Sequence, residues 1–145
     1  MEKILELNLR YKYAIKNKKR PRINRYTKYN PSEKDELLVE NDTITLVTEL
    51  SSRMTLDLLK EIESYKDRKD ICVSVEIDNV YWTKTKKHYG KPKLSSPDVD
   101  NYIKLFCDAN NGFLWNDDRI VYKMSGTKTM GPEAKATVVI KYYQI

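Results

Sequence analysis

The stretch Ile71-Cys72-Val73-Ser74-Val75-Glu76-Ile77 decides which kind of fold this chain can form. Its branched apolar residues occupy every second position, and a period of two is typical of a strand that buries one face. The regions on both sides of this strand carry patterns of their own, and their order along the chain sets the fold class.

Toward the N-terminus, the sequence predicts an opening strand whose apolar positions are Leu5, Leu7, Leu9, Tyr11 and Tyr13. A helix is predicted to start at Asn30-Pro31, because asparagine caps free N–H groups and proline fits the first turn. This helix either ends near Asn41 or continues along an i, i+4 apolar stripe, which favours helix at least from Met54 to Tyr65. The stretch from Thr43 to Thr48 stays open, since its β-branched residues also suit a strand.

Toward the C-terminus, the sequence predicts a helix from Asn101 to Asn111, with Gly112 as its stop. Two closing strands follow, separated by a turn at Gly131-Pro132. Their apolar positions are Ile120, Tyr122 and Met124 in the first, and Ala136, Val138, Ile140 and Tyr142 in the second. The order of the elements predicts an α+β fold in which a mixed β-sheet is packed against helices. The length of 145 residues suits a single domain that spans residues 1–145.

Charge and cysteine content narrow the class of protein further. The formal net charge is +6 and the pI about 9.1, which favours a polyanionic partner. Cys72 and Cys107 have neither CxxC spacing nor a histidine cluster beside them, so we expect reduced thiols and no zinc site. The chain shows neither the apolar run of a signal peptide nor a membrane-spanning stretch, so we expect a cytoplasmic protein with no membrane contact.

Basic residues gather in two segments that are predicted to be exposed loops. The first runs from Lys16 to Lys28 and contains no acidic residue, and the second runs from Trp82 to Lys93. Lysines and arginines there would contact phosphates, and neighbouring aromatic rings would stack on unpaired bases, although solvated loops have similar composition. The candidate DNA-binding residues are Lys18, Lys19, Arg20, Arg22, Arg25, Lys84, Lys86 and Lys87.

Carboxylates concentrate in Ser95-Ser96-Pro97-Asp98-Val99-Asp100-Asn101-Tyr102-Ile103-Lys104 and again in Trp115-Asn116-Asp117-Asp118. If a helix began at Pro97, Asp98 and Asp100 would lie about 200° apart around its axis. If the chain is extended through Val99, both side chains point the same way, and Asp100 can cap a helix on which Lys104 lies one turn further. Asp117 and Asp118 could then close the site.

Gathered carboxylates repel one another unless a cation neutralises them. Mg²⁺, with Mn²⁺ as a substitute, suits this set because it takes oxygen ligands, whereas the single histidine argues against zinc. Such an ion activates water and polarises a phosphoryl group, and Lys104 would stabilise charge on the phosphate. The same aspartates would equally suit turns and solvated loops.

These segments resemble the RusA family of Holliday junction resolvases. The run Pro97-Asp98-Val99-Asp100-Asn101 with Lys104, then Asp108-Ala109-Asn110-Asn111-Gly112, then Asn116-Asp117-Asp118-Arg119-Ile120-Val121, is similar to the family pattern PDxDNxxK, DAxNG, xDDxxIV. Lys19-Arg20-Pro21-Arg22 is similar to the KxRPR element of many members. The chain departs from the pattern at Asn110, where the family generally has leucine, and the resemblance leaves residues 43–69 without a matching motif.

The resemblance implies a RusA-like fold and assigns roles to the acidic segments. Asp98, Asp100 and Asp118 would bind the metal ion, with Asp117 as a second candidate beside Asp118, and Lys104 would be the catalytic lysine. It also implies a Mg²⁺-dependent endodeoxyribonuclease of phage or prophage type that cuts branched DNA, above all four-way junctions, in recombination and repair. A homodimer is implied, since a junction needs two symmetric cuts. The alternatives are a basic nucleic-acid-binding protein without catalysis and a nuclease that prefers flaps or forks.

Overall fold

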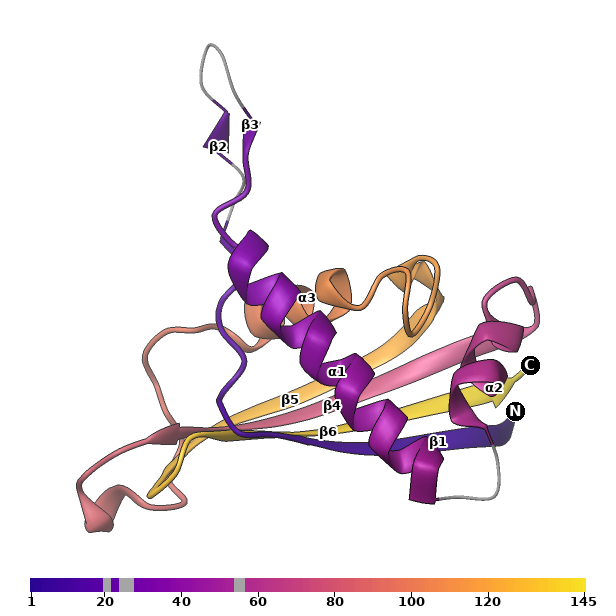
Figure 1. Ribbon diagram of the computed structural model, residues 1–145. Coiled ribbons are helices and arrows are strands. Elements are labelled where there is room, and N and C mark those ends of the chain that lie inside the picture. Colours follow the sequence, from indigo (N-terminus) through magenta and orange to yellow (C-terminus); the bar gives the residue numbers. More distant parts are fainter. Residues whose placement is uncertain (20–21, 24–27, 54–56) are drawn as a thin grey trace.

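Four strands form one mixed β-sheet in the computed structural model, which describes residues 1–19, 22–23, 28–53 and 57–145. β1 (Glu2–Tyr11), β6 (Lys135–Gln144), β4 (Ile71–Trp82) and β5 (Val121–Gly131) lie side by side in that order (Figure 1). β4 pairs in parallel with β5 and antiparallel with β6, and β1 pairs antiparallel with β6. The predicted opening strand and the predicted strand at residues 71–77 are both confirmed as members of this sheet.

The two C-terminal strands are not neighbours, so the turn at Gly131-Pro132 does not close a simple hairpin. β5 ends at Gly131 and β6 begins at Lys135, yet β4 lies between the two strands. Buried residues alternate along β4 and β6, whereas most of β5 is exposed or only half-buried. A strand with few buried positions suits the edge of a sheet better than its centre, and β5 takes that edge.

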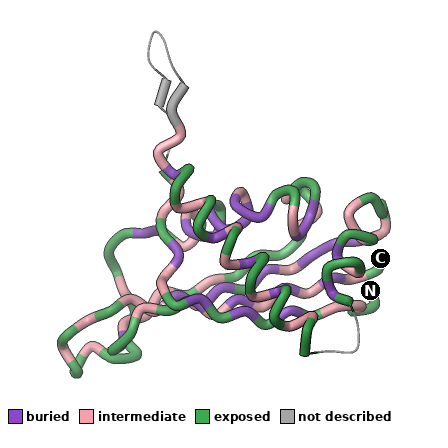
Figure 2. The backbone as a smooth tube through the Cα atoms, viewed as in Figure 1, coloured by how far each residue is buried: buried purple, intermediate pink, exposed green. Residues whose placement is uncertain are grey.

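Three helices cover one face of the sheet: α1 (Glu33–Arg53), α2 (Leu58–Tyr65) and α3 (Val99–Ala109) (Figure 1). Figure 2 shows the buried positions gathered between these helices and the sheet. The core draws on the sheet and on every helix, with members such as Leu9, Val39, Ile62, Phe106 and Ile140. This arrangement confirms the predicted α+β class with a mixed sheet packed against helices.

Helix α1 continues through the stretch from Thr43 to Thr48 that the sequence left open between helix and strand. Three of its threonines, Thr43, Thr45 and Thr48, bond back to the preceding turn. The Thr43 hydroxyl donates to the Val39 carbonyl oxygen, and the Thr48 hydroxyl to that of Ile44, each at 2.7 Å. These bonds give the hydroxyls partners within the helix, so the β-branched residues are compatible with it.

The ends of the first two helices differ from the sequence prediction. Asn30 does not cap α1 with its side chain; its Oδ1 accepts the N–H of Ser32 at 3.0 Å, and the helix begins at Glu33. α2 begins after Asp57, whose carboxylate accepts the N–H of Lys60 at 3.3 Å. The apolar stripe therefore spans two helices rather than one, and its member Met54 lies outside the described residues.

Shorter elements complete the chain. β2 (Arg22–Ile23) and β3 (Lys28–Tyr29) form a separate two-stranded sheet that projects beyond the helices, and η1 (Lys86–His88) and η2 (Asp118–Ile120) are single 3₁₀ turns (Figure 1). Cys72 and Cys107 are both free and buried. Among the helices in the described ranges, none is both long and apolar enough to cross a membrane.

Candidate active site

Helix α3 starts at Val99, between the two starting points considered from the sequence. Asp98 is the N-cap residue with extended backbone (φ −75°, ψ 148°), and its side chain makes no capping hydrogen bond. Asp100 lies in the first helical turn, where a negative charge interacts favourably with the helix dipole. A helix start at Pro97 and an extended chain through Val99 with Asp100 as the cap are therefore both wrong.

The position of α3 depends on a glycine in β5. A Cβ atom at Gly126 would lie 2.8 Å from Cγ1 of Val99 and would also clash with the Tyr102 hydroxyl. That hydroxyl lies 2.9 Å from the carbonyl oxygens of both Ile77 and Thr127, so its proton is shared between β4 and β5. Gly126 and Tyr102 together hold the helix close to the sheet. Sequence reasoning missed both residues, although a lone glycine inside a strand is a signal for close approach.

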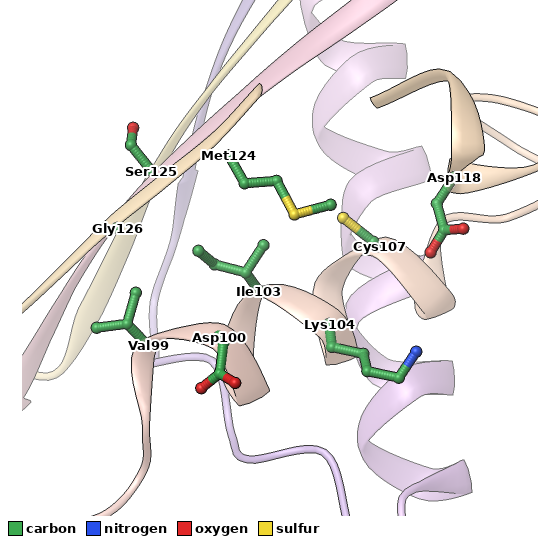
Figure 3. A pocket seen from close by; sticks show the side chains of 9 residues that line it. All are labelled: Val99, Asp100, Ile103, Lys104, Cys107, Asp118, Met124, Ser125 and Gly126. Atoms are coloured by element: carbon green, nitrogen blue, oxygen red, sulfur yellow. The ribbon is translucent and has the colours of Figure 1, made fainter. Parts of the chain in front are cut away.

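A cavity of about 620 Å³ opens beside α3, β5 and η2 (Figure 3). Asp100 and Lys104 line it from α3, and Asp118 lines it from η2. The remaining lining residues are Val99, Ile103, Cys107, Met124, Ser125 and Gly126. Tertiary folding therefore brings the two acidic segments of the sequence to one cavity. Asp98 is exposed and is not among the lining residues.

Asp117 and Asp118 have different surroundings although they are adjacent. The carboxylate of Asp117 is exposed and accepts the N–H of Arg119 at 2.9 Å, which caps η2. Asp118 faces the cavity (Figure 3). Burial raises the pKa of Asp118, and the negative charges of Asp108 and then Asp117 raise it further. A nearby cation would stabilise the ionised form of a carboxyl group in this position.

Among the described residues that line the cavity, Lys104 is the one with a basic side chain. Its Nζ lies 3.6 Å from Oδ2 of Asp108, one turn further along α3, and not against Asp100, one turn back. In Figure 3 the ammonium group extends away from Asp100, toward the side of the cavity where Asp118 lies. The Lys104 side chain is 60% exposed and is therefore accessible to a ligand.

The carboxylates that line the cavity would be suitable ligands for a hard divalent cation, but they do not form a complete ligand set. Within the described ranges, no group of three or more His, Cys, Asp and Glu side chains is arranged to hold a metal ion. Mg²⁺ often takes only one or two carboxylates and completes its shell with water and substrate phosphate, so Asp100 and Asp118 suit it. Zinc suits the cavity less, because burial raises the pKa of the Cys107 thiol that lines it to about 12.

Lys18 does not lie on an open basic surface. Its ammonium group pairs with Glu36 of α1 and lies 3.4 Å from Oδ2 of Asp108, and its side chain is only 13% exposed. Its backbone N–H donates to the carbonyl oxygen of Asn101 at 3.2 Å. Lys18 therefore connects α1 to α3, and this placement disfavours the phosphate contact that the sequence suggested.

The other candidate DNA-binding residues divide by how much of them is described. Lys19 is exposed, and so are Lys84, Lys86 and Lys87 beyond the end of β4. Trp82, at the start of that second basic segment, is 64% exposed. Arg20 and Arg25 lie outside the described residues, and only the backbone of Arg22, in β2, is described. Figure 1 shows β2–β3 and η1 projecting from the body in different directions.

Two carboxylates and a lysine in one cavity of a basic protein are typical of enzymes that act on phosphate esters. The family model described as endodeoxyribonuclease RusA matches residues 12–141 of this chain. The chain belongs to the RusA family of endodeoxyribonucleases, which confirms the resemblance in its acidic motifs. No curated protein matches the chain.

Proposed function

We propose that this protein is a Mg²⁺-dependent endonuclease that resolves four-way DNA junctions in recombination and repair. Membership of the RusA family supports a nuclease of this kind. The observation that carries the proposal is the cavity in which Asp100, Lys104 and Asp118 meet from two separate parts of the chain. A partly buried carboxyl group with a raised pKa, such as Asp118 in this cavity, is more typical of a functional site than of a purely structural one.

The side chains of the cavity would share the work of hydrolysing a phosphodiester bond. Asp100 and Asp118 would hold the cation, with Asp98 at the start of α3 as a further ligand. When bound, Mg²⁺ would supply an activated water molecule and polarise the phosphoryl group, and Mn²⁺ would substitute. Lys104 would stabilise the negative charge that develops on the phosphate oxygens. Ile103 and Met124 would keep bulk water from part of the cavity, which strengthens these charge interactions.

The rival function is nucleic-acid binding without catalysis, with the aspartates only capping and orienting loops. In the part of the chain that the structure describes, no backbone N–H and no basic side chain bonds the carboxylates of Asp98, Asp100 or Asp118. Asp117, in contrast, does cap η2. Of these three, Asp118 is only partly exposed and still lacks such a partner, which a cation or a substrate would explain better than capping.

The DNA would be held as a branched substrate by a homodimer. A junction has two symmetric scissile strands, and a two-fold dimer places two active sites on them. The net charge of +6 would attract the phosphates, and the exposed Lys19, Lys84, Lys86 and Lys87 would contact them. The exposed ring of Trp82 is placed beside the second basic segment, where it would stack on an unpaired base. A cytoplasmic location, and a phage or prophage origin, belong to the same proposal.

The test compares cleavage of a synthetic four-way junction, a flap and a linear duplex, each with Mg²⁺, Mn²⁺ or EDTA. We expect paired, metal-dependent cuts in the junction and little cutting of the duplex. Asp98→Asn, Asp100→Asn and Asp118→Asn should each abolish cleavage while junction binding persists, because a lost charge weakens cation binding but lessens repulsion of phosphate. Junction cutting that persists in EDTA, or full activity in two of these variants, would contradict the assignment.

Asp117→Asn is the matched comparison, and it should cost less activity because this side chain caps η2. Thermal melting separates loss of catalysis from loss of folding. Since the pKa of Asp118 is raised in the folded state, its contribution to stability is present below the unfolded value of 3.8 and is lost as the pH rises through the folded pKa. Asp118→Asn should therefore melt above the wild type at neutral pH, and this advantage should disappear in acid.

A further inference from the structure

We propose that Asp108 is a positioning residue for cleavage, which holds the ammonium group of Lys104 at the cavity and is itself held by Lys18. This inference rests on the proposed function, in which Lys104 stabilises charge on the phosphate. Asp108 does not line the cavity, so it would act through Lys104 and not on the substrate.

One carboxylate oxygen faces two ammonium groups. Oδ2 of Asp108 lies 3.4 Å from Nζ of Lys18 and 3.6 Å from Nζ of Lys104. Lys18 in turn pairs with Glu36 of α1. Alternating charges therefore run from α1, through the N-terminal segment, to the cavity face of α3. The unlike neighbours in this line stabilise one another at each step.

Three of these four charged side chains are largely shielded from solvent, and the fourth, Lys104, is not. Side-chain exposure is 13% for Lys18, 19% for Glu36 and 22% for Asp108, but 60% for Lys104. Ion pairs in partly buried positions are screened less by water and salt than exposed ones. Lys18 thus holds the carboxylate of Asp108 in place, and this carboxylate in turn pairs with the ammonium group of the exposed Lys104.

Two aspartates of α3, Asp100 and Asp108, are each four residues from Lys104, so either could form an ion pair with it. Asp100 is one turn before Lys104, and an acid on the N-terminal side is the better i, i+4 partner in an isolated helix. The structure nevertheless pairs Lys104 with Asp108. Asp108 therefore does two things: it restrains a long, flexible side chain, and it keeps Lys104 away from Asp100. The carboxylate of Asp100 is left free for a cation.

A double-mutant cycle on the cleavage rate tests this role. Single-turnover cleavage of a saturated four-way junction with Mg²⁺ is measured for the wild type, Asp108→Asn, Lys104→Ala and the double variant. We expect Asp108→Asn to slow cleavage roughly tenfold, because the lysine loses its fixed position. Lys104→Ala should slow it about 10²-fold, as when one preorganised donor is lost. The double variant should be no slower than Lys104→Ala, since the proposed positioning by Asp108 is exerted through this lysine.

Asp35→Asn is the matched control. Asp35 has the same exposed fraction as Asp108, 22%, and pairs at 3.5 Å with Lys16 in the N-terminal segment, but this ion pair does not involve α3. The cleavage rate of the control variant should equal that of the wild type. Melting midpoints are recorded for every variant, and rates are compared below the lowest of them. If Asp108→Asn does not fold, Asp108→Glu takes its place, since it keeps the charge but displaces it by one methylene group.

The outcomes separate this inference from the proposed function. If the wild type cuts no DNA with Mg²⁺, the proposed function fails. If the wild type cuts and Asp108→Asn cuts equally fast, the inference fails alone. It also fails if Asp108→Asn causes the same proportional loss with and without Lys104, because a purely structural role would produce that result.

Discussion

Gly126→Ala should push helix α3 away from the sheet and so lower both stability and cleavage. The added methyl group would lie 2.8 Å from Cγ1 of Val99 and closer still to the Tyr102 hydroxyl. Tyr102 has no room to yield, since it is fully buried and its hydroxyl bridges the carbonyl oxygens of Ile77 and Thr127.

Two terms set the size of the effect. Overpacking in a well-packed core costs about 1–3 kcal/mol, and disturbing the Tyr102 hydrogen bond adds about 1 kcal/mol. We therefore expect the free energy of unfolding to fall by about 2–4 kcal/mol, which for a chain of this length is roughly 5–15 °C in Tm. Cleavage should fall roughly tenfold, because Asp100 and Lys104 are both carried by the displaced helix.

Tyr102→Phe is the partner change, since it removes the atom that the new methyl group would approach most closely. Alone it should cost about 1 kcal/mol. Combined with Gly126→Ala, the loss should be smaller than the sum of the two by at least about 0.5 kcal/mol, because one clash has been relieved. Urea unfolding of the four proteins, run beside single-turnover cleavage, gives these values. Strictly additive losses, or a Gly126→Ala variant as stable as the wild type, would refute the reasoning.

Asn110→Leu should raise the free energy of unfolding by about 1–2 kcal/mol, because Oδ1 of the buried Asn110 has no hydrogen-bond partner among the described residues and leucine is of similar size. Denaturant unfolding checks this; a loss of stability would instead show that the bond from its Nδ2 to the Phe106 carbonyl oxygen, at 3.0 Å, matters more. Changing the exposed Lys84, Lys86 and Lys87 together to alanine should weaken binding to every DNA shape. The slope of log binding constant against log salt concentration should fall by roughly 0.9 for each duplex phosphate that is no longer neutralised. Titrations of a labelled junction at several salt concentrations measure this slope. An unchanged slope would mean that the segment carrying these lysines does not touch the DNA backbone.

The sequence by itself determined the features that depend on local pattern. Alternation of apolar residues is a property of a single strand, so β1, β4 and β6 could be predicted without knowing their neighbours. The order and spacing of the acidic motifs are likewise written in the chain, and they were sufficient to recognise the family that the match over residues 12–141 shows. The sequence alone also shows that Asn110 stands where the family pattern generally has leucine.

Only the tertiary structure decided the features that depend on contacts between distant residues. The place of β4 between β5 and β6 follows from which strands can bury more side chains, which no single strand reveals. Asp118 rather than Asp117 lines the cavity because Asp117 caps η2. The sequence predicted Lys18 to be one more exposed basic residue, but its burial against Glu36 and Asp108 requires α1 and α3 to be in place. Whether a lysine in a basic segment is free to bind phosphate therefore depends on whether the fold places an acidic side chain beside it.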